Sequence, residues 1–536
     1  MSKSEKIQTP KILRNKWYLY MTEFFSGVSV MAVELGASRL LAPYFSSSQI
    51  VWTIIIGTIM IAMALGNIYG GKSADKNPNP DKLYARMLFA AVWIAAIPFV
   101  GKFVIGGIAA LLVLTVNTNF LIWAAFITCM IVFVFPLFLL GTVTPSLVKY
   151  TVDSLDDSGK TVGTLGAFNT IGSIIGTFVP TFISIPTVGT AVTFLIFGGI
   201  LLVIALIYFI SAKKKAVKAV SAAAVFIVCC FVSPMLSFAF WESDLDYEGE
   251  SVYNYLQVKD TPSATYLSTN VLFGVQSVYM KKGVLTGLYY DYAMAAPLMC
   301  DTDSDEKELL VLGMGTGTYA KQCTEYFGNI VAEGVEIDDK ITDLAREYFD
   351  MSDDIKVTSY DGRAFLNVCD KKYDVIMVDA YQDITIPFQM SSVEFFRLVK
   401  NCLKDNGVMV VNMNMRSKKA DDINTALSDT ISAVFDNVYT IDVRGSSNRE
   451  LFASNNKNML SALNENIKYI EQSDLAEIMY VVSDGLIPYE STGTVLTDDK
   501  APVELLGMKV IDELIQSELS YYKKQIKENG FSALLE

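Results

Sequence analysis

Between residues 309 and 379, a glycine-rich turn and three carboxylate residues follow one another at similar intervals. The turn follows the first of four short apolar runs, and an acid stands at or near the end of each later run, namely Glu336, Asp361 and Asp379. Apolar runs that alternate with helix-like segments predict a parallel sheet with helices on its faces. Ligands bind such sheets beyond the carboxyl ends of the strands. We therefore expect the turn and the three acids to line one cleft.

The glycine-rich turn has the sequence GMGTGT and contains Gly313, Gly315 and Gly317. The first glycine permits a tight turn, and the second lets the backbone approach a ligand closely. This pattern alone fits many nucleotide-binding folds, but here it follows a predicted strand and opens a predicted helix. Glu336 lies at roughly the interval at which an acid binds the two hydroxyls of a ribose. Together these features indicate a nucleoside site.

The two later acids have different candidate roles. Asp361 and Gly362 open the helix after the third strand, where Asp either caps the helix or accepts a hydrogen bond from the amine of an adenine. Asp379 ends the fourth strand, where a carboxylate beside a bound sulfonium could take a proton from an attacking amine. The chain has no histidine, so the base must be a carboxylate, Tyr, Lys or Cys, and imidazole metal sites are excluded. No metal is expected.

The segment before this sheet has the pattern of a small β-rich unit. Residues 251–260 alternate apolar and polar, as a half-exposed strand does, and further strands are expected over 265–279. A Tyr-Tyr-Asp-Tyr cluster at 289–292 then opens a helix that ends near Met299. The cluster is interpreted either as core packing or as a gate over the cleft.

Composition divides the chain into a membrane half and a soluble half. Of the 536 residues, 52% are hydrophobic, and this excess is concentrated between residues 17 and 240. We expect an N-terminal α-helical transmembrane bundle (1–240), a small β-rich segment (241–300) and a Rossmann-like, methyltransferase-type α/β domain (301–536). The net charge is −14, and the soluble half has no basic face, which argues against a nucleic-acid partner.

Seven apolar runs each approach the ~20 residues that a bilayer requires. Four basic segments border them and, by the positive-inside rule, would all lie in the cytosol. Seven crossings would then place the soluble half outside, whereas adenosyl substrates are cytosolic. We expect the soluble half to be cytosolic, with either 87–116 or 163–186 re-entrant or interfacial. The seven runs are 17–42, 50–71, 87–113, 120–141, 163–186, 191–211 and 217–240.

Several segments resemble the spermidine/spermine synthases, the aminopropyltransferases. Over about residues 250–510 these are LLVLGMGTGT, VEID, DGRAFL, YDVIMVDAY and VEFFRLVK. The segments VELGASRLLAPYFSSS, VWTIIIGTIM, ALGNIYGGKSAD and LTDDKAPVE are similar to the membrane-fused, multi-pass variety. The resemblance implies a methyltransferase-like Rossmann fold after a small β-domain. It also implies transfer of an aminopropyl group from decarboxylated S-adenosylmethionine to an amine, with release of methylthioadenosine.

The resemblance assigns roles by position. Gln276 matches a nucleoside-contacting Gln, Glu336 the ribose acid, Asp361 the adenine contact and Asp379 the catalytic Asp. Tyr290 matches the Tyr of the family's Tyr-His-Glu segment. The predicted donor-binding residues are Gln276, Gly313, Gly315, Gly317, Glu336, Asp361 and Gly362. The predicted amine-binding residues are Tyr290, Asp291, Tyr381 and Asp383.

This sequence differs from the family's motifs at three places, all in the part of the site that binds the propylamine group and the polyamine. The Asp of GGGDGG, which holds the donor's amine, is replaced by Thr316. The His-Glu pair becomes Asp291-Tyr292, and the second Asp of the DxxD pattern becomes Gln382, with Asp383 one place along. A donor amine without its carboxylate partner loses a charged hydrogen bond worth ~1.5–3 kcal/mol. Intact S-adenosylmethionine therefore stays open as the donor.

Three classes of function remain open. The first is a membrane-bound, aminopropyltransferase-like enzyme in which Asp379 deprotonates the amine or polyamine acceptor. The second is an S-adenosylmethionine-dependent methyltransferase of the same fold. The third is a transporter or sensor with a nucleoside-binding soluble half. We expect an amine acceptor and the lipid bilayer of the cell membrane as partners, no nucleic acid, and a homodimer as one candidate assembly.

Overall fold

The computed structural model describes residues 10–116, 118–151, 158–213, 216–235, 237–242, 244–271, 274–300, 306–381, 386–414, 416 and 422–529. Two units share the chain. One comprises Met1–Ser243 with Gly249–Tyr255, and the other Asp244–Glu248 with Leu256–Glu536.

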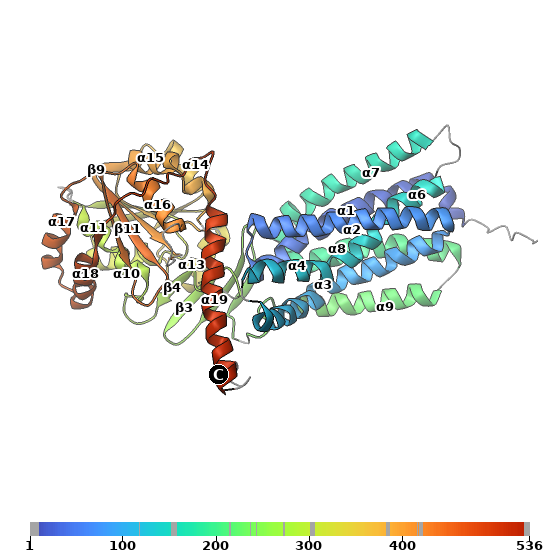
Figure 1. The fold of residues 1–536 in the computed structure, drawn as a ribbon, viewed down its shortest axis with the longest axis horizontal. Helices are drawn as coiled ribbons and strands as arrows, with labels where there is room; N and C mark the ends of the chain where they lie inside the picture. Colours follow the sequence, from blue (N-terminus) through green and yellow to red (C-terminus); the bar gives the residue numbers. More distant parts are fainter. Residues whose placement is uncertain are drawn as a thin grey trace, which may run out of the picture. The chain divides into compact units, whose positions relative to one another are not determined.

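The first unit is built from long apolar helices that lie alongside one another (Figure 1). Asn15, Ser48 and Asn79 each cap a helix, with the side chain accepting a hydrogen bond from a backbone N–H of the first turn. The helices are α1 (Lys16–Phe45), α2 (Gln49–Lys76), α3 (Pro80–Thr115), α4 (Phe120–Val132), α5 (Val134–Gly141), α6 (Val143–Thr151), α7 (Ser158–Val179), α8 (Ile185–Ala212) and α9 (Ala216–Val232).

In the described residues, six helical stretches are long and apolar enough to cross a membrane, and Phe120–Val132 is a shorter apolar helix. The longest stretch, Ser158–Ala212, has 55 residues and is bent at Gly189, whose φ is 78°. It contains two of the runs expected from the sequence. Of the two candidates for a re-entrant or interfacial run, 87–116 does not form a re-entrant loop, because α3 continues to Thr115 as one helix without reversing. Which of the two runs fails to cross the bilayer stays a prediction.

The strands form a small sheet and a large sheet, and the large sheet lies in the second unit. The small sheet has the order β1-β2-β3-β4, with antiparallel pairs β2–β3 and β3–β4. The strand expected over 251–260 is only partly correct. Ser251–Asn254 is a turn, closed by a 2.8 Å hydrogen bond from Ser251 N–H to the Asn254 carbonyl. The strands are β1 (Tyr247–Glu250), β2 (Tyr255–Asp260), β3 (Ala264–Ser268) and β4 (Ser277–Met280).

The large sheet has eight strands in the described residues, in the order β12-β10-β11-β9-β8-β5-β6-β7. The segment β9-β8-β5-β6-β7 is parallel, whereas β11, β10 and β12 continue the sheet antiparallel. The strands are β5 (Lys307–Leu312), β6 (Ile330–Glu336), β7 (Lys356–Ser359), β8 (Tyr373–Val378), β9 (Leu403–Met413), β10 (Asn437–Asp442), β11 (Arg449–Ser454) and β12 (Ile487–Pro488).

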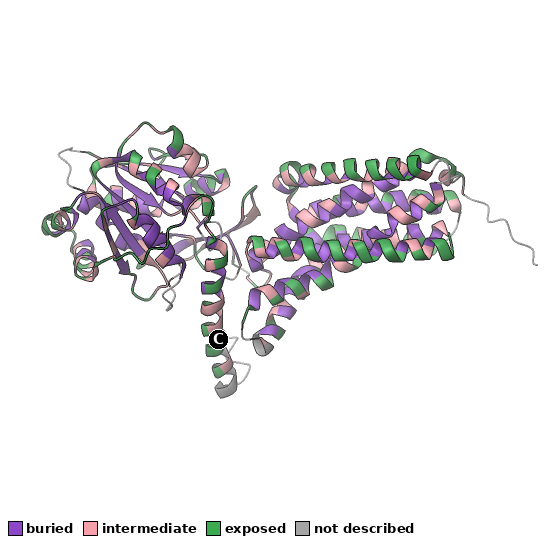
Figure 2. Cartoon of the chain, turned by 45° about the horizontal axis from the view of Figure 1, so that its top comes forward, coloured by how far each residue is buried: buried purple, intermediate pink, exposed green. Residues whose placement is uncertain are grey.

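Helices connect these strands and cover the sheet, so the Rossmann-like fold expected from the sequence is confirmed. Every residue of β8 is buried, as expected for a central parallel strand covered on both faces, and Figure 2 shows the central strands as the most buried part of this unit. The helices are α10 (Tyr289–Ala293), α11 (Ala295–Met299), α12 (Thr318–Phe327), α13 (Asp339–Tyr348), α14 (Gly362–Val368), α15 (Val393–Cys402), α16 (Ile423–Ser432), α17 (Met459–Asn466), α18 (Ser473–Gly485) and α19 (Val503–Asn529).

Candidate active site

The carboxyl ends of the parallel strands bring the predicted acids to one edge of the sheet. Leu312 at the end of β5 is paired with Val335 of β6 on one side and with Val378 of β8 on the other. The chain order changes direction at β5, with β6 and β8 as its neighbours. This is the switch point at which open α/β sheets bind ligands.

The glycine turn leaves β5 with its three glycines at positive φ, 81° for Gly313, 55° for Gly315 and 83° for Gly317. A Cβ on Gly313 would lie 2.5 Å from the carbonyl oxygen of Asp379, and one on Gly315 would lie 2.8 Å from Ser277 Oγ. Any side chain at Gly313 would therefore strain the turn and displace Asp379. The backbone N–H of Asp379 donates to the Leu312 carbonyl at 2.9 Å, which ties β8 to this turn.

Glu336 joins the turn to the end of β6. Its Oε2 accepts from Gly315 N–H at 2.9 Å, and its Oε1 accepts from Asp338 N–H at 3.1 Å. Burial raises the pKa of Glu336 to about 7, although these backbone hydrogen bonds favour the charged form. Each oxygen retains a second acceptor position, so the carboxylate suits a pair of neighbouring hydroxyl groups.

Asp361 lies after β7, next to Glu336 in the sheet, because Ser359 is paired with Glu336. Its Oδ1 accepts from Ala364 N–H at 2.8 Å, so it does cap helix α14. Gly362 follows at the first position of that helix, and a Cβ there would lie 3.3 Å from Met390 Cε.

Asp379 is held by two side chains from outside its own strand. Its Oδ2 accepts from the Tyr289 hydroxyl at 2.7 Å, and its Oδ1 accepts from Asn412 Nδ2 at 2.9 Å. Asn412 is itself fixed, since its Oδ1 accepts from Asn448 Nδ2 at 2.8 Å. Both oxygens of the carboxylate are thereby oriented before any substrate binds.

The surroundings of Asp379 adjust its acidity. Loss of water on burial raises the pKa of Asp379 to about 7, and the negative charge of Glu336 acts in the same direction. The hydrogen bonds from Tyr289 and Asn412 oppose this shift because they stabilise the carboxylate. Asp379 can therefore both hold and release a proton near neutral pH, as a general base requires.

Tyr289, and not Tyr290, reaches Asp379. The Tyr290 hydroxyl donates instead to the Gln276 carbonyl at 2.9 Å, and its ring packs on that of Tyr289 with centroids 4.0 Å apart. Successive residues of a helix point about 100° apart, so the two tyrosines reach different partners, and the predicted contact of Tyr290 with the amine stays a prediction. The Gln276 N–H donates to the Leu267 carbonyl at 2.8 Å, so this residue connects β3 and β4 with Tyr290.

The structure gives Asp291 a structural role, and its predicted contact with the amine stays a prediction. Its carboxylate is 1% exposed and accepts hydrogen bonds from the backbone of Thr286 and Gly287 and from Gln322 Nε2 at 2.6 Å. A carboxylate with this many donors from its own loop is structural, because it fixes the segment that leads into Tyr289.

The remaining predicted amine contacts lie on the segment after β8. The Tyr381 hydroxyl donates to the backbone carbonyl of Asn412 and accepts from Asn414 N–H at 3.3 Å, so it packs over β9 beside Asp379. Asp383 lies outside the described residues, as does Gln382. Thr316 is 3% exposed, and its hydroxyl lies 3.4 Å from that of Thr318.

Sequence reasoning missed three polar residues on or beside the paired strands β9 and β11: Asn412, Asn448 and Glu450. Asn412 could have been found, because it ends an apolar run just as Glu336 and Asp379 do. Asn448 precedes β11 and Glu450 lies on it, and only the pairing of β11 with β9 brings them to Asn412. No sequence motif marks that pairing.

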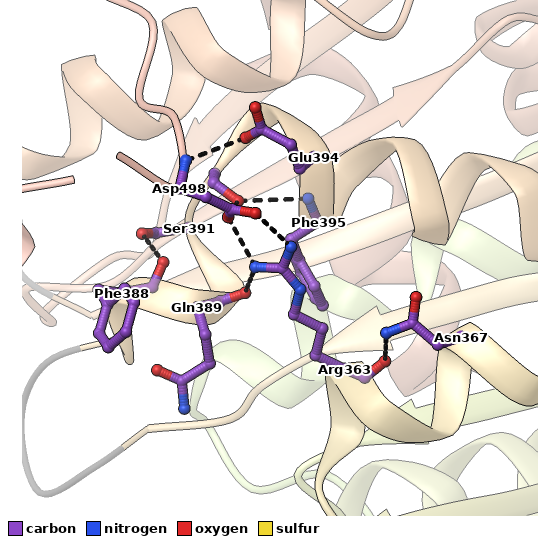
Figure 3. A network of polar contacts seen from close by, with 9 residues as sticks. Arg363, Asn367, Phe388, Gln389, Ser391, Glu394, Phe395 and Asp498 are labelled. Carbon is purple, nitrogen blue, oxygen red and sulfur yellow. Dashed lines mark hydrogen bonds and ion pairs between the residues drawn. The ribbon is translucent and has the colours of Figure 1, made fainter. Parts of the chain in front are cut away.

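Asp498 of the LTDDKAPVE segment takes part in a network of polar contacts, which Figure 3 shows. Asp498 forms a two-pronged ion pair with Arg363, with Nη1–Oδ1 at 2.7 Å and Nη2–Oδ2 at 2.6 Å. Arg363 also donates to the Gln389 carbonyl at 2.9 Å, and Ser392 donates to Asp498 at 2.5 Å. The network therefore connects Arg363, the residue after Gly362, with Gln389 and with Asp498 of the LTDDKAPVE segment.

Comparisons with known proteins agree with this geometry. Residues 288–460 match the spermine/spermidine synthase domain. A "probable polyamine aminopropyl transferase" of Bifidobacterium longum is 52% identical over 347 residues, which cover 62% of this chain and 77% of that protein. The polyamine aminopropyltransferase of Vibrio vulnificus is 24% identical over 298 residues, covering 52% of this chain and 96% of the relative.

Solved structures are also similar to the second unit. A crystal structure of spermidine synthase with the transition-state analogue AdoDATO covers 45% of this chain and 84% of its own, at 16% identity and a TM-score of 0.38. Because half of the aligned residues are identical over three quarters of the Bifidobacterium protein, the chain belongs to the polyamine aminopropyltransferase family of transferases.

Proposed function

We propose that this protein is a membrane-bound aminopropyltransferase that uses decarboxylated S-adenosylmethionine and an amine or polyamine acceptor. The observation that carries the proposal is the position of Asp379, oriented by Tyr289 and Asn412 at the switch point of the sheet. Family membership supplies the reaction class.

The residues at the strand ends suit the nucleoside of the donor. Gly313, Gly315 and Gly317 have no Cβ that would block a ligand, and Glu336 is buried with acceptor capacity left on both oxygens. In the proposed complex Gly313 and Gly315 lie against the donor, Glu336 accepts from the ribose hydroxyls, and Asp361 accepts from the adenine amine. The bound donor supplies an aminopropyl carbon activated by a positively charged sulfur.

Asp379 would carry the proton transfer. An acceptor amine arrives mainly as an ammonium ion and must lose a proton before its nitrogen can attack. Asp379 takes that proton, the new N–C bond forms as the C–S bond breaks, and the bonding pair remains on sulfur in methylthioadenosine. A carboxylate fixed through both oxygens needs no reorientation during this step.

The membrane location rests on the first unit. Six helical stretches in the described residues have the length and apolar composition of membrane spans. The basic segments between them support a cytosolic location for the loops, and the adenosyl donor supports the same side for the second unit. We therefore also propose that the first unit is a multi-pass anchor in the cell membrane and that the transferase unit lies in the cytosol.

Mass spectrometry of the reaction products tests the proposed chemistry. The full chain would be incubated with decarboxylated or intact S-adenosylmethionine and a panel of mono-, di- and triamines. We expect methylthioadenosine and an aminopropylated amine from the decarboxylated donor alone. Adenosylhomocysteine with a methylated amine would replace the proposal by a methyltransferase, and binding without any product would reject an enzyme.

A further inference from the structure

Glu450 is a buried acid beside the transfer site that the proposed chemistry does not use. It lies on β11 and is 0% exposed. Neither oxygen of its carboxyl group has a hydrogen-bond partner among the described residues. Burying an unpaired carboxylate costs several kcal/mol, so a residue of this kind requires an explanation.

Its position relates it directly to Asp379. Glu450 and Asn412 are paired across β11 and β9, and residues directly opposite in an antiparallel pair extend to the same face with Cβ atoms about 5 Å apart. Asn412 donates its amide hydrogen to Asp379. Glu450 therefore lies on the side of Asn412 that faces away from β8, at the same level of the sheet as the base.

The titratable groups facing Glu450 from the elements around it are acids and phenols. They are Asp379 and Tyr381 after β8 and Tyr319 on α12, and β10 places Ile441 opposite Glu450. Arg416 and Arg449, two cationic residues near β11, each form an ion pair with Asp442. Burial and then the charge of Asp379 raise the pKa of Glu450 well above its usual value, which favours the protonated form in the free protein.

The substrates of the proposed reaction bring the charge that the site lacks. Decarboxylated S-adenosylmethionine carries a sulfonium and an ammonium group, and the acceptor carries at least one more ammonium. A positive charge within about 4–6 Å favours the ionised form of a carboxyl group. At the same time, no residue of the glycine turn from Gly313 to Thr318 is charged, so a counter-charge for the donor's ammonium has to come from other segments.

We propose that Glu450 releases its proton to solvent when the cationic donor binds, and that the resulting carboxylate balances the donor's charge next to Asp379. Glu450 is then a positioning residue that acts through the local charge and does not touch the reacting atoms. The inference rests on the proposed function, because the proposed donor supplies the cation.

Calorimetry in two buffers of different protonation enthalpy measures the number of protons released on binding. The full chain at pH 7 would be titrated with decarboxylated S-adenosylmethionine and with methylthioadenosine, which has the same nucleoside but neither positive charge. We expect proton release with the donor and far less with methylthioadenosine. Glu450→Gln should release measurably fewer protons and bind the donor about tenfold more weakly, with unchanged affinity for methylthioadenosine.

Two variants control for folding and for charge. Glu490→Gln removes an exposed acid of the same unit and should behave like the unmodified protein, whereas Glu450→Asp keeps the acid and should recover part of the proton release. Unchanged affinity for methylthioadenosine shows that the variants are folded.

If Glu450→Gln releases as many protons as the unmodified chain, the inference is wrong even when product still forms. Donor binding without product from any amine would reject the proposed function and leave the proton count interpretable.

Discussion

Asp379 accepts hydrogen bonds from Tyr289 and Asn412 and lies near the acid Glu336, and together with burial these groups determine the pH at which it can accept a proton. Tyr289 and Asn412 stabilise the carboxylate, while burial and Glu336 destabilise it, and the result is a pKa of about 7. An exposed Asp would be ionised at almost any pH in a cell but would be a weaker base.

The pH dependence of the unmodified protein follows from this pKa. The base must be ionised to act, so kcat/KM should fall about tenfold per pH unit well below pH 7 and level off above it. Initial rates at low donor concentration from pH 5.5 to 8.5 would measure the profile. A plateau that extends unchanged down to pH 5.5 would show that the group responsible has an ordinary carboxylate pKa.

Removing one hydrogen bond to Asp379 should change both rate and profile. Tyr289→Phe should lower kcat about tenfold, equal to roughly 1.4 kcal/mol of transition-state stabilisation, and move the rise in kcat/KM to higher pH because the carboxylate loses a stabilising donor. Tyr290→Phe is the matched control, since its hydroxyl binds the Gln276 carbonyl. Equal kinetics for the two variants would contradict the assignment of Tyr289.

The sequence predicts the residues that end buried parallel strands better than those that reach the site from elsewhere. Glu336 and Asp379 end apolar runs, and the common direction of the strands brings them together. Tyr289 differs from the predicted Tyr290 by one position, which the sequence pattern does not resolve. Glu450 sits on a strand whose partner depends on the antiparallel return of the chain, and local sequence does not encode this.

At the scale of elements, the Arg363–Asp498 pair connects three segments of the second unit. It joins the start of α14, the segment around Gln389 and the loop that begins at Leu496, where Val393 N–H donates to the Leu496 carbonyl at 2.9 Å. The pair holds the pKa of Asp498 at about 2, chiefly through the hydrogen bond from Arg363, so it persists at all physiological pH values. Because Asp361 and Gly362 precede Arg363 directly, the pair also fixes the proposed adenine contact.

Breaking this pair should weaken nucleoside binding more than it weakens the fold. Asp498→Asn should cost about 0.5–1 kcal/mol of unfolding free energy, because the pair is partly exposed, and should weaken methylthioadenosine binding several-fold. Asp499→Asn alters the adjacent exposed acid and serves as the control. Calorimetric dissociation constants and thermal unfolding of the full chain measure both effects. Indistinguishable nucleoside affinities would remove Asp498 from the positioning of α14.

The sequence predicts a helix or strand well where burial determines its pattern of apolar residues. β5 and β8 read as continuous apolar runs because helices cover both faces, and they were recognised. The turn at Ser251–Asn254 was missed because no glycine or proline within these four residues marks it. Helix α3 was misread as a re-entrant candidate because Pro98 lies within it, although the helix continues past this proline.

At the scale of the whole molecule, the chain joins an apolar helical unit to a transferase unit. The helical unit has six stretches of membrane-spanning length and composition in its described residues, and the longest contains two of the seven expected runs. If all seven runs cross, the positive-inside rule places the second unit outside, so its proposed cytosolic location rests on the adenosyl donor. The proposed cytosolic location of the second unit matters for function, because adenosyl donors and amine acceptors must both reach it.

A single introduced cysteine can test this orientation. Cys300 and Cys402 are buried, so Asp484→Cys on exposed α18 would provide the reporter. We expect a membrane-impermeant maleimide to label it in inverted vesicles and not in intact spheroplasts, with the parent chain as background. Labelling in intact spheroplasts would place the transferase unit outside and overturn the proposed location.

The most direct test of the proposed chemistry compares donor binding and turnover of Asp379→Asn in one preparation of the full chain. The substitution keeps the size of the side chain and its contact with Asn412 but removes the base. We predict donor affinity within about threefold of the unmodified protein and methylthioadenosine formation slower by about 10³-fold. Turnover near the unmodified rate with the donor bound normally would show that Asp379 does not take the proton from the acceptor.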